Sequence, residues 1–246
     1  MSGSLEGKLA LVTGASRGIG KAVAKALAAE GAHVIAVARA KSQGALEELD
    51  DEIKQLSGES ATLVPMDLTD GKAIDRLGGA IYERWGKLDI LVSNAGILGP
   101  VSPLGHVSVK DWDKVIASNL STHFRLIRSL DPLLKAADAG RAIFVTSGAA
   151  GKHKQYWGPY AASKAALEEL ALTYSAECSI TNIKVNLIDP GPVATAMRAQ
   201  AMPGEDPKTL PSPDDVAPLF VELAQDAVTT SGEIVKFYDW AGIERD

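Results

Sequence analysis

One glycine-rich stretch constrains the fold of this chain more than any other, because it must connect a buried strand to a helix. Residues 8–13 form a mostly apolar run, and residues 21–30 follow a helical pattern. Between them, Gly14, Gly18 and Gly20 are spaced G-x-x-x-G-x-G. Glycine permits positive φ and close backbone approach, and the free N–H groups of a helix start attract phosphate. The stretch is either a phosphate-binding turn or a tight connection without a ligand, and the flanking elements favour the phosphate.

Strand and helix patterns continue to alternate along the rest of the chain. Strands are expected at residues 8–13, 33–39, 61–66, 88–93, 141–147, 182–188 and 231–237. Their near-continuous apolar character is typical of parallel strands that helices cover on both faces. The sequence therefore predicts an α/β fold, a single Rossmann-type doubly wound parallel sheet of seven strands with helices on both faces. One dinucleotide-binding domain is expected over residues 1–246.

Composition excludes several classes of partner. The net charge of −6, without a cluster of Lys and Arg, argues against binding nucleic acid. No apolar run reaches the ~18 residues that span a bilayer, and the first residues do not resemble a signal peptide. We therefore expect a cytoplasmic protein that does not bind a membrane. The single cysteine, Cys178, is expected to be a core residue, and the four histidines lack ligand-like spacing, so no metal is expected.

The end of the second expected strand bears on the choice of nucleotide. In a doubly wound fold this position reaches the adenine ribose, and an acidic residue there would bind both hydroxyls of NAD. This chain instead places Ala38 and Arg39 there. A guanidinium can pair with a 2′-phosphate, and Arg17 in the glycine turn can reach the same group. The pattern favours NADP(H) over NAD(H), although Arg39 can also be only a solvated residue at the start of a loop.

Three further polar residues follow or interrupt apolar segments. Asp67 follows the third strand, where it can accept a hydrogen bond from the adenine amine or cap the helix that begins near residues 69–70. Asn94, after the fourth strand, can fix its own turn by local hydrogen bonds. Asn119 lies among apolar positions of a long helix expected over residues 109–136. It is either a satisfied structural amide or part of a polar site.

A tyrosine and a lysine share one face of the helix that follows the fifth strand. Tyr160 and Lys164 are spaced i, i+4, and the fifth strand ends in Ser147. A nearby ammonium favours the phenolate and would lower the tyrosine pKa toward the range of a general acid or base. Taken alone, such a pair is usually a surface feature.

The segment after the sixth strand has the composition of a loop that covers a ligand. We expect a substrate loop around residues 192–211, and its part from 196 to 210 is expected to be mobile. Candidate pocket residues come from this loop, from the segment between the fifth strand and Tyr160, and from the loop after the fourth strand. They are Met197 and Met202, then Gly148, His153 and Trp157, and Leu98.

With these segments in place, the chain resembles the short-chain dehydrogenase/reductase family over essentially its whole length. Residues 13–20 are similar to the family's cofactor turn, and residues 93–96 to its N-N-A-G segment, with Ser93 in place of the first Asn. The catalytic tetrad is matched by Asn119, Ser147, Tyr160 and Lys164. Among family members, the chain is most similar to bacterial proteins related to 3-oxoacyl-carrier-protein reductase.

The resemblance implies an oxidoreductase that transfers hydride between NADP(H) and a carbonyl or secondary alcohol. Tyr160 would be the general acid or base, Lys164 would lower its pKa and hold the nicotinamide ribose, and Ser147 would bind the carbonyl oxygen. Asn119 would hold a water that resupplies protons. His153 and Trp157 would bind substrate beside Ser147. Cofactor contacts are implied for Gly14, Ser16, Arg17, Gly18, Ile19, Gly20, Arg39, Asp67, Leu68, Asn94, Ala95, Gly96, Tyr160, Lys164, Pro190, Gly191, Val193 and Thr195.

Two questions accompany the resemblance. The alternative function is a sensor or scaffold that binds NADP(H) without turnover, although an intact tetrad argues against it. The family usually forms homodimers or homotetramers, and such an oligomer is expected here. The C-terminal residues 235–240 depart from the family's valine-rich strand, which puts the usual subunit contact at that end in doubt.

Overall fold

A computed structural model of the protein describes residues 3–244, and its centre is one parallel sheet. The strand order is β3-β2-β1-β4-β5-β6-β7, and each neighbouring pair is parallel. The strands are β1 (Leu9–Thr13), β2 (His33–Ala38), β3 (Thr62–Pro65), β4 (Ile90–Ser93), β5 (Arg141–Val145), β6 (Lys184–Asp189) and β7 (Ile234–Lys236). The prediction of a doubly wound seven-stranded α/β sheet is confirmed. The predicted strands were correct in number and order, and most ended one or two residues from the observed bounds.

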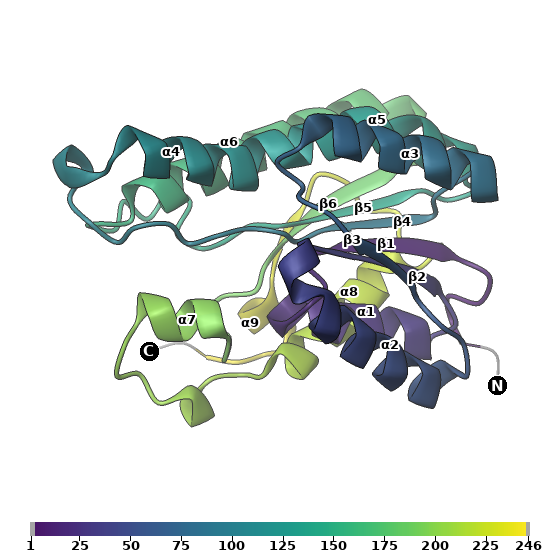
Figure 1. Ribbon diagram of the computed structural model, residues 1–246, viewed down its shortest axis with the longest axis horizontal. Helices are drawn as coiled ribbons and strands as arrows, with labels where there is room; N and C mark the ends of the chain where they lie inside the picture. The colour runs from purple at the N-terminus through teal and green to yellow at the C-terminus, as the bar shows by residue number, and fades with distance from the viewer. Residues whose placement is uncertain (1–2, 245–246) are drawn as a thin grey trace.

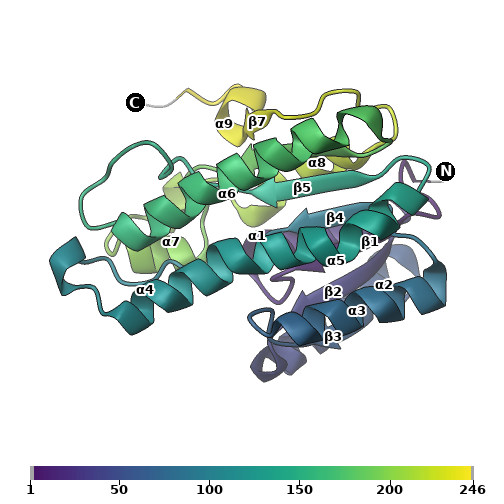
Figure 2. The same ribbon diagram turned by 90° about the horizontal axis from the view of Figure 1, so that it is seen from above.

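Helices cover both faces of the sheet, as Figures 1 and 2 show. On one face lie α1 (Gly18–Ala29), α2 (Gln43–Ser57) and α8 (Pro213–Ala224). On the other lie α3 (Gly71–Trp85), α4 (Val109–Ile116), α5 (Thr122–Ala136) and α6 (Gly158–Glu177). Buried apolar side chains form one cluster on each face, which is why the strands are apolar on both sides. Within residues 3–244, no helix is both long and apolar enough to span a bilayer.

The strand order fixes where a ligand can bind. The chain builds outward from β1 through β2 to β3, and then returns to the other side of β1 with β4. Helices that leave these strands therefore diverge above and below the sheet, which opens a crevice at the carboxyl ends of β1 and β4. Figure 1 shows α4 and the short helix α7 (Ala196–Ala201) extending beyond this same end of the sheet, on opposite sides of it.

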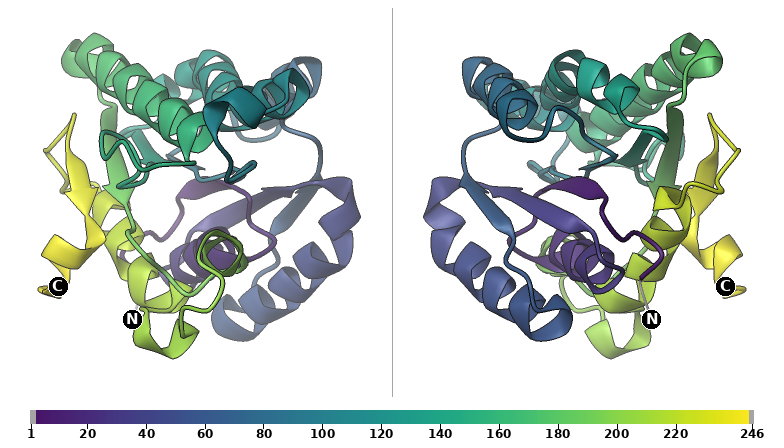
Figure 3. Two further views of the ribbon diagram at one scale, coloured as in Figure 1. Left: turned by 90° about the vertical axis from the view of Figure 1, so that its left-hand side faces the viewer. Right: turned by 90° about the vertical axis from the view of Figure 1, so that its right-hand side faces the viewer.

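Three segments differ from their expected structure. The helix predicted over residues 109–136 is interrupted by a π-helical turn, Ala117–Ser121, between α4 and α5. The segment 196–210, for which no helix was predicted, contains α7 and a 3-10 turn, Pro207–Thr209. The last strand is shorter than predicted, because Phe237 already begins a short helix, α9 (Phe237–Trp240). Figure 3 shows this C-terminal segment at the edge of the sheet opposite α2.

Candidate functional site

The glycine turn leaves the first N–H groups of α1 without a side-chain cap. Arg17 occupies the N-cap position in an extended conformation, and its side chain makes no capping hydrogen bond. Gly14 has φ +71° and Gly18 has φ +56°, which are left-handed conformations that favour glycine. A helix start of this kind binds anions through its N–H groups and its dipole. The turn therefore has the free N–H groups and the glycine conformations that the phosphate-binding interpretation requires.

Asn94 and Thr13 join the glycine turn to the end of β4. The Asn94 side-chain amide donates to the Thr13 carbonyl oxygen at 2.8 Å. The Thr13 hydroxyl accepts from the backbone N–H groups of Asn94 at 2.9 Å and Ala95 at 3.0 Å, and donates to the Val92 carbonyl. Asn94 thus fixes a neighbouring strand rather than its own turn, which corrects the local interpretation. The role of Thr13 was not predicted, although its position directly before the glycines was a signal.

Gly20 is held in a space that admits no side chain. A Cβ atom added to Gly20 would overlap the Gly14 carbonyl oxygen and would lie 2.5 Å from the Asn94 amide nitrogen. Both are fixed by the hydrogen bonds between β1 and β4. The absence of a side chain at Gly20 is therefore a packing requirement of the turn.

We expect Gly20→Ala to lower the free energy of unfolding by about 1–3 kcal/mol, because overpacking forces the backbone to shift. Gly79→Ala is the matched control, since Gly79 is an exposed helical glycine whose added Cβ meets open space. That control should be neutral or stabilise by up to about 1 kcal/mol. Urea unfolding of both variants checks the prediction. Equal stabilities would show that the turn tolerates a side chain at residue 20.

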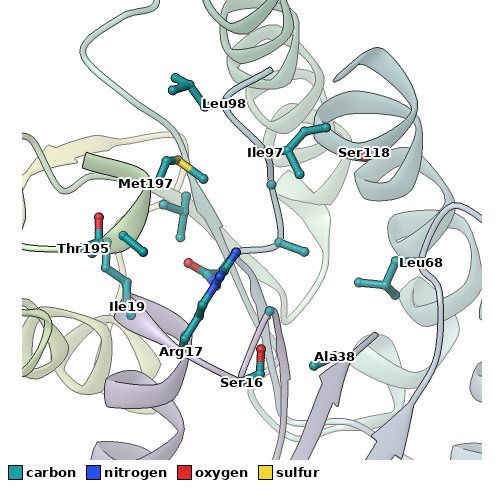
Figure 4. A pocket seen from close by; sticks show the side chains of 18 of the residues that line it. Ser16, Arg17, Ile19, Ala38, Leu68, Ile97, Leu98, Ser118, Thr195 and Met197 are labelled. Atoms are coloured by element: carbon teal, nitrogen blue, oxygen red, sulfur yellow. The ribbon is translucent and has the colours of Figure 1, made fainter. Parts of the chain in front are cut away.

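One cavity of about 480 Å³ follows the carboxyl ends of the central strands. Figure 4 shows Ala38 and Leu68 at one side, Thr195 and Met197 at the other, and the Arg17 side chain between them. The cavity is lined by every residue predicted to contact the cofactor, and by Ser147 and Trp157. Of the residues to which the family resemblance assigns a catalytic, cofactor or substrate role, Asn119 and His153 lie outside the cavity wall. The sequence motifs therefore mark one continuous site.

Tyr160, Lys164 and Ser147 meet at one end of this cavity. Tyr160 hydrogen-bonds Ser147, and both Tyr160 and Lys164 are buried. The Lys164 ammonium lies 5.9 Å from the centre of the Tyr160 ring and donates to the Val145 carbonyl at 2.7 Å. This ammonium therefore lies between the tyrosine and the end of β5.

Burial is the largest effect on both ionisable groups. It raises the pKa of Tyr160 to about 12, and the hydrogen bond from Ser147 opposes this shift. It lowers the pKa of Lys164 to about 8, and the Glu168 carboxylate opposes that shift. Each shift favours the neutral form, because a charge loses hydration on burial. The prediction that Lys164 lowers the pKa of Tyr160 is therefore wrong for the free protein, because burial raises that pKa and the opposing effect comes from Ser147.

Asn119 is a fully satisfied buried amide. Its carbonyl oxygen accepts from the Ile97 N–H at 2.8 Å, and its NH₂ group donates to the Ile97 carbonyl at 2.9 Å and to Ser163 at 3.0 Å. It lies behind Gly96, whose added Cβ would meet both the Asn119 oxygen and the Lys164 ammonium. The structure thus shows the satisfied structural amide that was one of the two alternatives for Asn119.

A buried histidine supports the same wall. His123 is fully buried; its Nδ1 lies 2.6 Å from the Ser93 hydroxyl, and its Nε2 lies 3.1 Å from the Ala95 carbonyl oxygen. Burial and the nearby Lys164 charge lower the pKa of His123 to about 3. The neutral ring therefore accepts from Ser93 and donates to Ala95. This contact was not predicted, although Ser93 in place of the expected Asn was a signal.

The Arg39 end of the cavity is rich in cations and hydroxyls. Arg39 lines it as predicted, joined by Lys41 and Ser42 from a 3-10 turn, Ala40–Ser42, and the Arg17 side chain points into the middle of the same cavity. Lys41 and Ser42 were not predicted to line the site, because a three-residue turn has no periodic sequence pattern. Several donors thus surround the space where an anion would lie.

Asp67 does not cap the following helix. Its carboxylate accepts from the Thr69 N–H at 2.9 Å and the Thr69 hydroxyl at 2.8 Å, whereas Asp70 is the N-cap of α3. These hydrogen bonds, with a smaller effect of Arg39, lower the pKa of Asp67. The capping alternative is wrong, because the helix begins one turn later than residue 67. Contact with an adenine amine stays a prediction.

The opposite end of the cavity is apolar. Leu98, Trp157 and Met197 line it as predicted, and Trp157 packs edge-on against Tyr160 with ring centres 5.9 Å apart. Three other candidates, Gly148, His153 and Met202, lie outside the cavity wall among the described residues. His153 is exposed and has φ +50°.

Comparison with known proteins agrees with this geometry. The family model described as short chain dehydrogenase matches residues 8–206. The chain is 35% identical to the oxidoreductase YciK of Escherichia coli K12, over 90% of this chain and 88% of the relative. It is 36% identical to the 3-oxoacyl-[acyl-carrier-protein] reductase FabG of the same organism, over 79% of this chain and 77% of the relative.

A solved structure is similar over nearly the whole fold. A short chain dehydrogenase from Shigella flexneri 2a strain 301, complexed with NADP, superimposes with a TM-score of 0.92 at 33% identity. The match covers 96% of this chain and 99% of that chain. The protein therefore belongs to the short chain dehydrogenase family, and it has the fold of an oxidoreductase of that family.

Proposed function

We propose that this protein transfers hydride between NADP(H) and a carbonyl or secondary alcohol substrate. The observation that carries the proposal is one continuous cavity with two chemically different ends. The glycine turn and cations lie at one end, and the Ser147–Tyr160–Lys164 group lies at the other. A dinucleotide fits this arrangement, because its pyrophosphate would meet the uncapped N-terminus of α1. The apolar space beyond Tyr160 is left for the substrate.

The catalytic residues are arranged to act on a carbonyl oxygen. A bound nicotinamide would supply or accept the hydride. The Tyr160 hydroxyl is protonated at neutral pH, since burial raises its pKa to about 12, so it can donate a proton to the oxygen. Ser147 hydrogen-bonds the Tyr160 hydroxyl and would donate to the same oxygen as negative charge develops there. Lys164 is still charged near neutral pH, and its ammonium, 5.9 Å from the centre of the Tyr160 ring, would favour negative charge that develops on the phenol oxygen during proton transfer.

For NADP(H) preference, the support is Arg39 with Lys41 and Ser42 at one end of the cavity, and Arg17 in its middle. We expect Arg39→Ala to weaken NADPH binding about ten-fold or more and to leave NADH binding within two-fold, because only NADPH carries the 2′-phosphate. Fluorescence titration of both nucleotides measures this. Arg84→Ala, on the exposed end of α3, is the matched control. Equal losses for both nucleotides would remove Arg39 from phosphate recognition.

The same titration is the first test of the proposed function. Saturable NADPH binding, followed by NADPH oxidation with a panel of ketones and 3-oxoacyl thioesters, would support a reductase. Failure to bind either nucleotide would contradict the proposal. Binding without turnover of any carbonyl compound or alcohol would favour the sensor or scaffold alternative.

A further inference from the structure

Residues 194–211, here called the lid, form a closed and internally bonded loop. The Ala194 N–H donates to the Pro211 carbonyl at 2.9 Å, which joins the two ends of the segment. The Thr195 hydroxyl accepts from the Arg198 N–H at 3.1 Å and caps α7. The Arg198 guanidinium donates two hydrogen bonds to the Glu205 carboxylate. The lid is thus a preformed unit that presents Met197 and other side chains to the cavity.

The segment that leads into Tyr160 faces this lid in an unusual conformation. His153 has φ +50° and Tyr156 has φ +71°, which are left-handed values that side chains other than glycine rarely adopt. Two such residues within four positions show that surrounding contacts hold the segment against its local preference. One of these is backbone: the Ser102 N–H donates to the Tyr156 carbonyl at 3.0 Å.

Lys154, between those two residues, touches both the lid and the cavity wall. Its ammonium lies 3.6 Å from the Met202 sulfur, and its charge helps to lower the pKa of Glu205 after the larger effect of Arg198. The same ammonium lies 4.4 Å from the centre of the Trp157 ring. Trp157 in turn packs edge-on against Tyr160. A single cation therefore connects the lid, through one indole ring, to the proposed general acid.

We propose that Lys154 is a positioning residue that holds the lid against Trp157 and so sets the apolar wall of the substrate site. The ammonium stacks on one face of the indole, which fixes the ring where Leu98 and Met197 complete the wall. Its contact with the Met202 sulfur and its longer-range attraction to the Glu205 carboxylate hold the lid closed over the same space. The substrate class that fits this wall is a carbonyl compound with an apolar or aromatic substituent. This part of the inference rests on the proposed function.

The test compares Lys154→Met, which removes the charge and keeps an unbranched stem, with Lys154→Arg, which keeps the charge. Lys152→Met, from an exposed lysine in the same segment, is the matched control. The first readout is tryptic cleavage after Arg198 and Lys208, followed by mass spectrometry, which requires neither nucleotide nor turnover. We expect cleavage in Lys154→Met to be about five-fold faster than in the wild type, with Lys154→Arg and the control unchanged.

The second readout uses a carbonyl substrate with an apolar substituent. In Lys154→Met we expect KM to rise about five-fold while kcat and NADPH affinity stay within two-fold, because the residue shapes the wall and not the reacting atoms. Lys154→Arg should restore the wild-type KM. Unchanged cleavage in Lys154→Met would overturn the inference even if the protein is a reductase. Faster cleavage in a protein that binds no nucleotide would instead contradict only the proposed function.

Discussion

Replacing Tyr160 with Phe is expected to reduce kcat for carbonyl reduction by about a thousand-fold. The substitution removes one hydroxyl from a buried ring and leaves its packing against Trp157 in place. Without that hydroxyl, the developing charge on the substrate oxygen keeps a hydrogen bond from Ser147 but has no proton donor. General acid catalysis contributes about 10²–10⁴-fold to a rate, and the expected loss lies in the middle of this range. The measurement is steady-state NADPH oxidation.

The same variant separates the enzyme from the sensor. NADPH affinity should stay within two-fold, because the glycine turn and Arg39 do not involve the phenol. Tyr82→Phe, on an exposed tyrosine of α3, serves as a control with the same chemical change. If Tyr160→Phe kept the wild-type rate, Tyr160 would have no part in the mechanism. Loss of both turnover and nucleotide binding would point to a disturbed structure and not to a lost proton.

His123 is expected to make the stability of the protein depend on pH well above the range in which carboxylates titrate. Burial lowers its pKa to about 3 in the folded state, whereas the unfolded value is about 6.5. Below pH 6.5 the unfolded chain therefore binds a proton that the folded chain excludes. As the pH falls from 6.5 to 3, the free energy of unfolding decreases by about 1.4 kcal/mol for each pH unit. Between pH 7.5 and pH 5 the decrease is about 2 kcal/mol. Urea unfolding at a series of pH values measures this slope.

A control must remove the other histidine whose lowered pKa also makes the free energy of unfolding decrease at acid pH. The pKa of His33 is also lowered by burial, so the slope should be measured in His33→Gln and in the double variant His33→Gln/His123→Gln. The lowered carboxyl pKa values, such as those of Glu52 and Asp67, act mainly below pH 5. The slope between pH 6.5 and 5 should persist in the single variant and disappear in the double variant. A slope that survives in both would assign the pH dependence to other groups.

Much of the fold was predictable from sequence because its signals are local. A buried parallel strand has to be apolar along its whole length, and residues 33–38 follow that pattern at every position after the first. The turn after β1 needs glycine where φ is positive, so Gly14 and Gly18 mark it without reference to the rest of the chain. The order of strands and helices then leaves few topologies, and that order places the crevice.

Short elements were predicted less well, for a related reason. The helix α7 has six residues, too few to display a period, and it is fixed by the Thr195 cap and the Arg198–Glu205 pair. The π-helical turn at Ala117–Ser121 has no sequence signature at all. It lies where Asn119 must reach the backbone of Ile97, which is a tertiary requirement.

The sequence by itself determined the fold class, the glycine turn after β1 and the helical spacing of Tyr160 and Lys164, because each signal lies in residues within a few positions of one another. Only the tertiary structure decided that Asn94 is bound to Thr13, which lies 81 residues away, and that His123 joins Ser93 to Ala95. It also decided the pKa shifts of Tyr160 and Lys164, since these arise from burial. Burial depends on what distant segments pack around a group, and no local pattern records that.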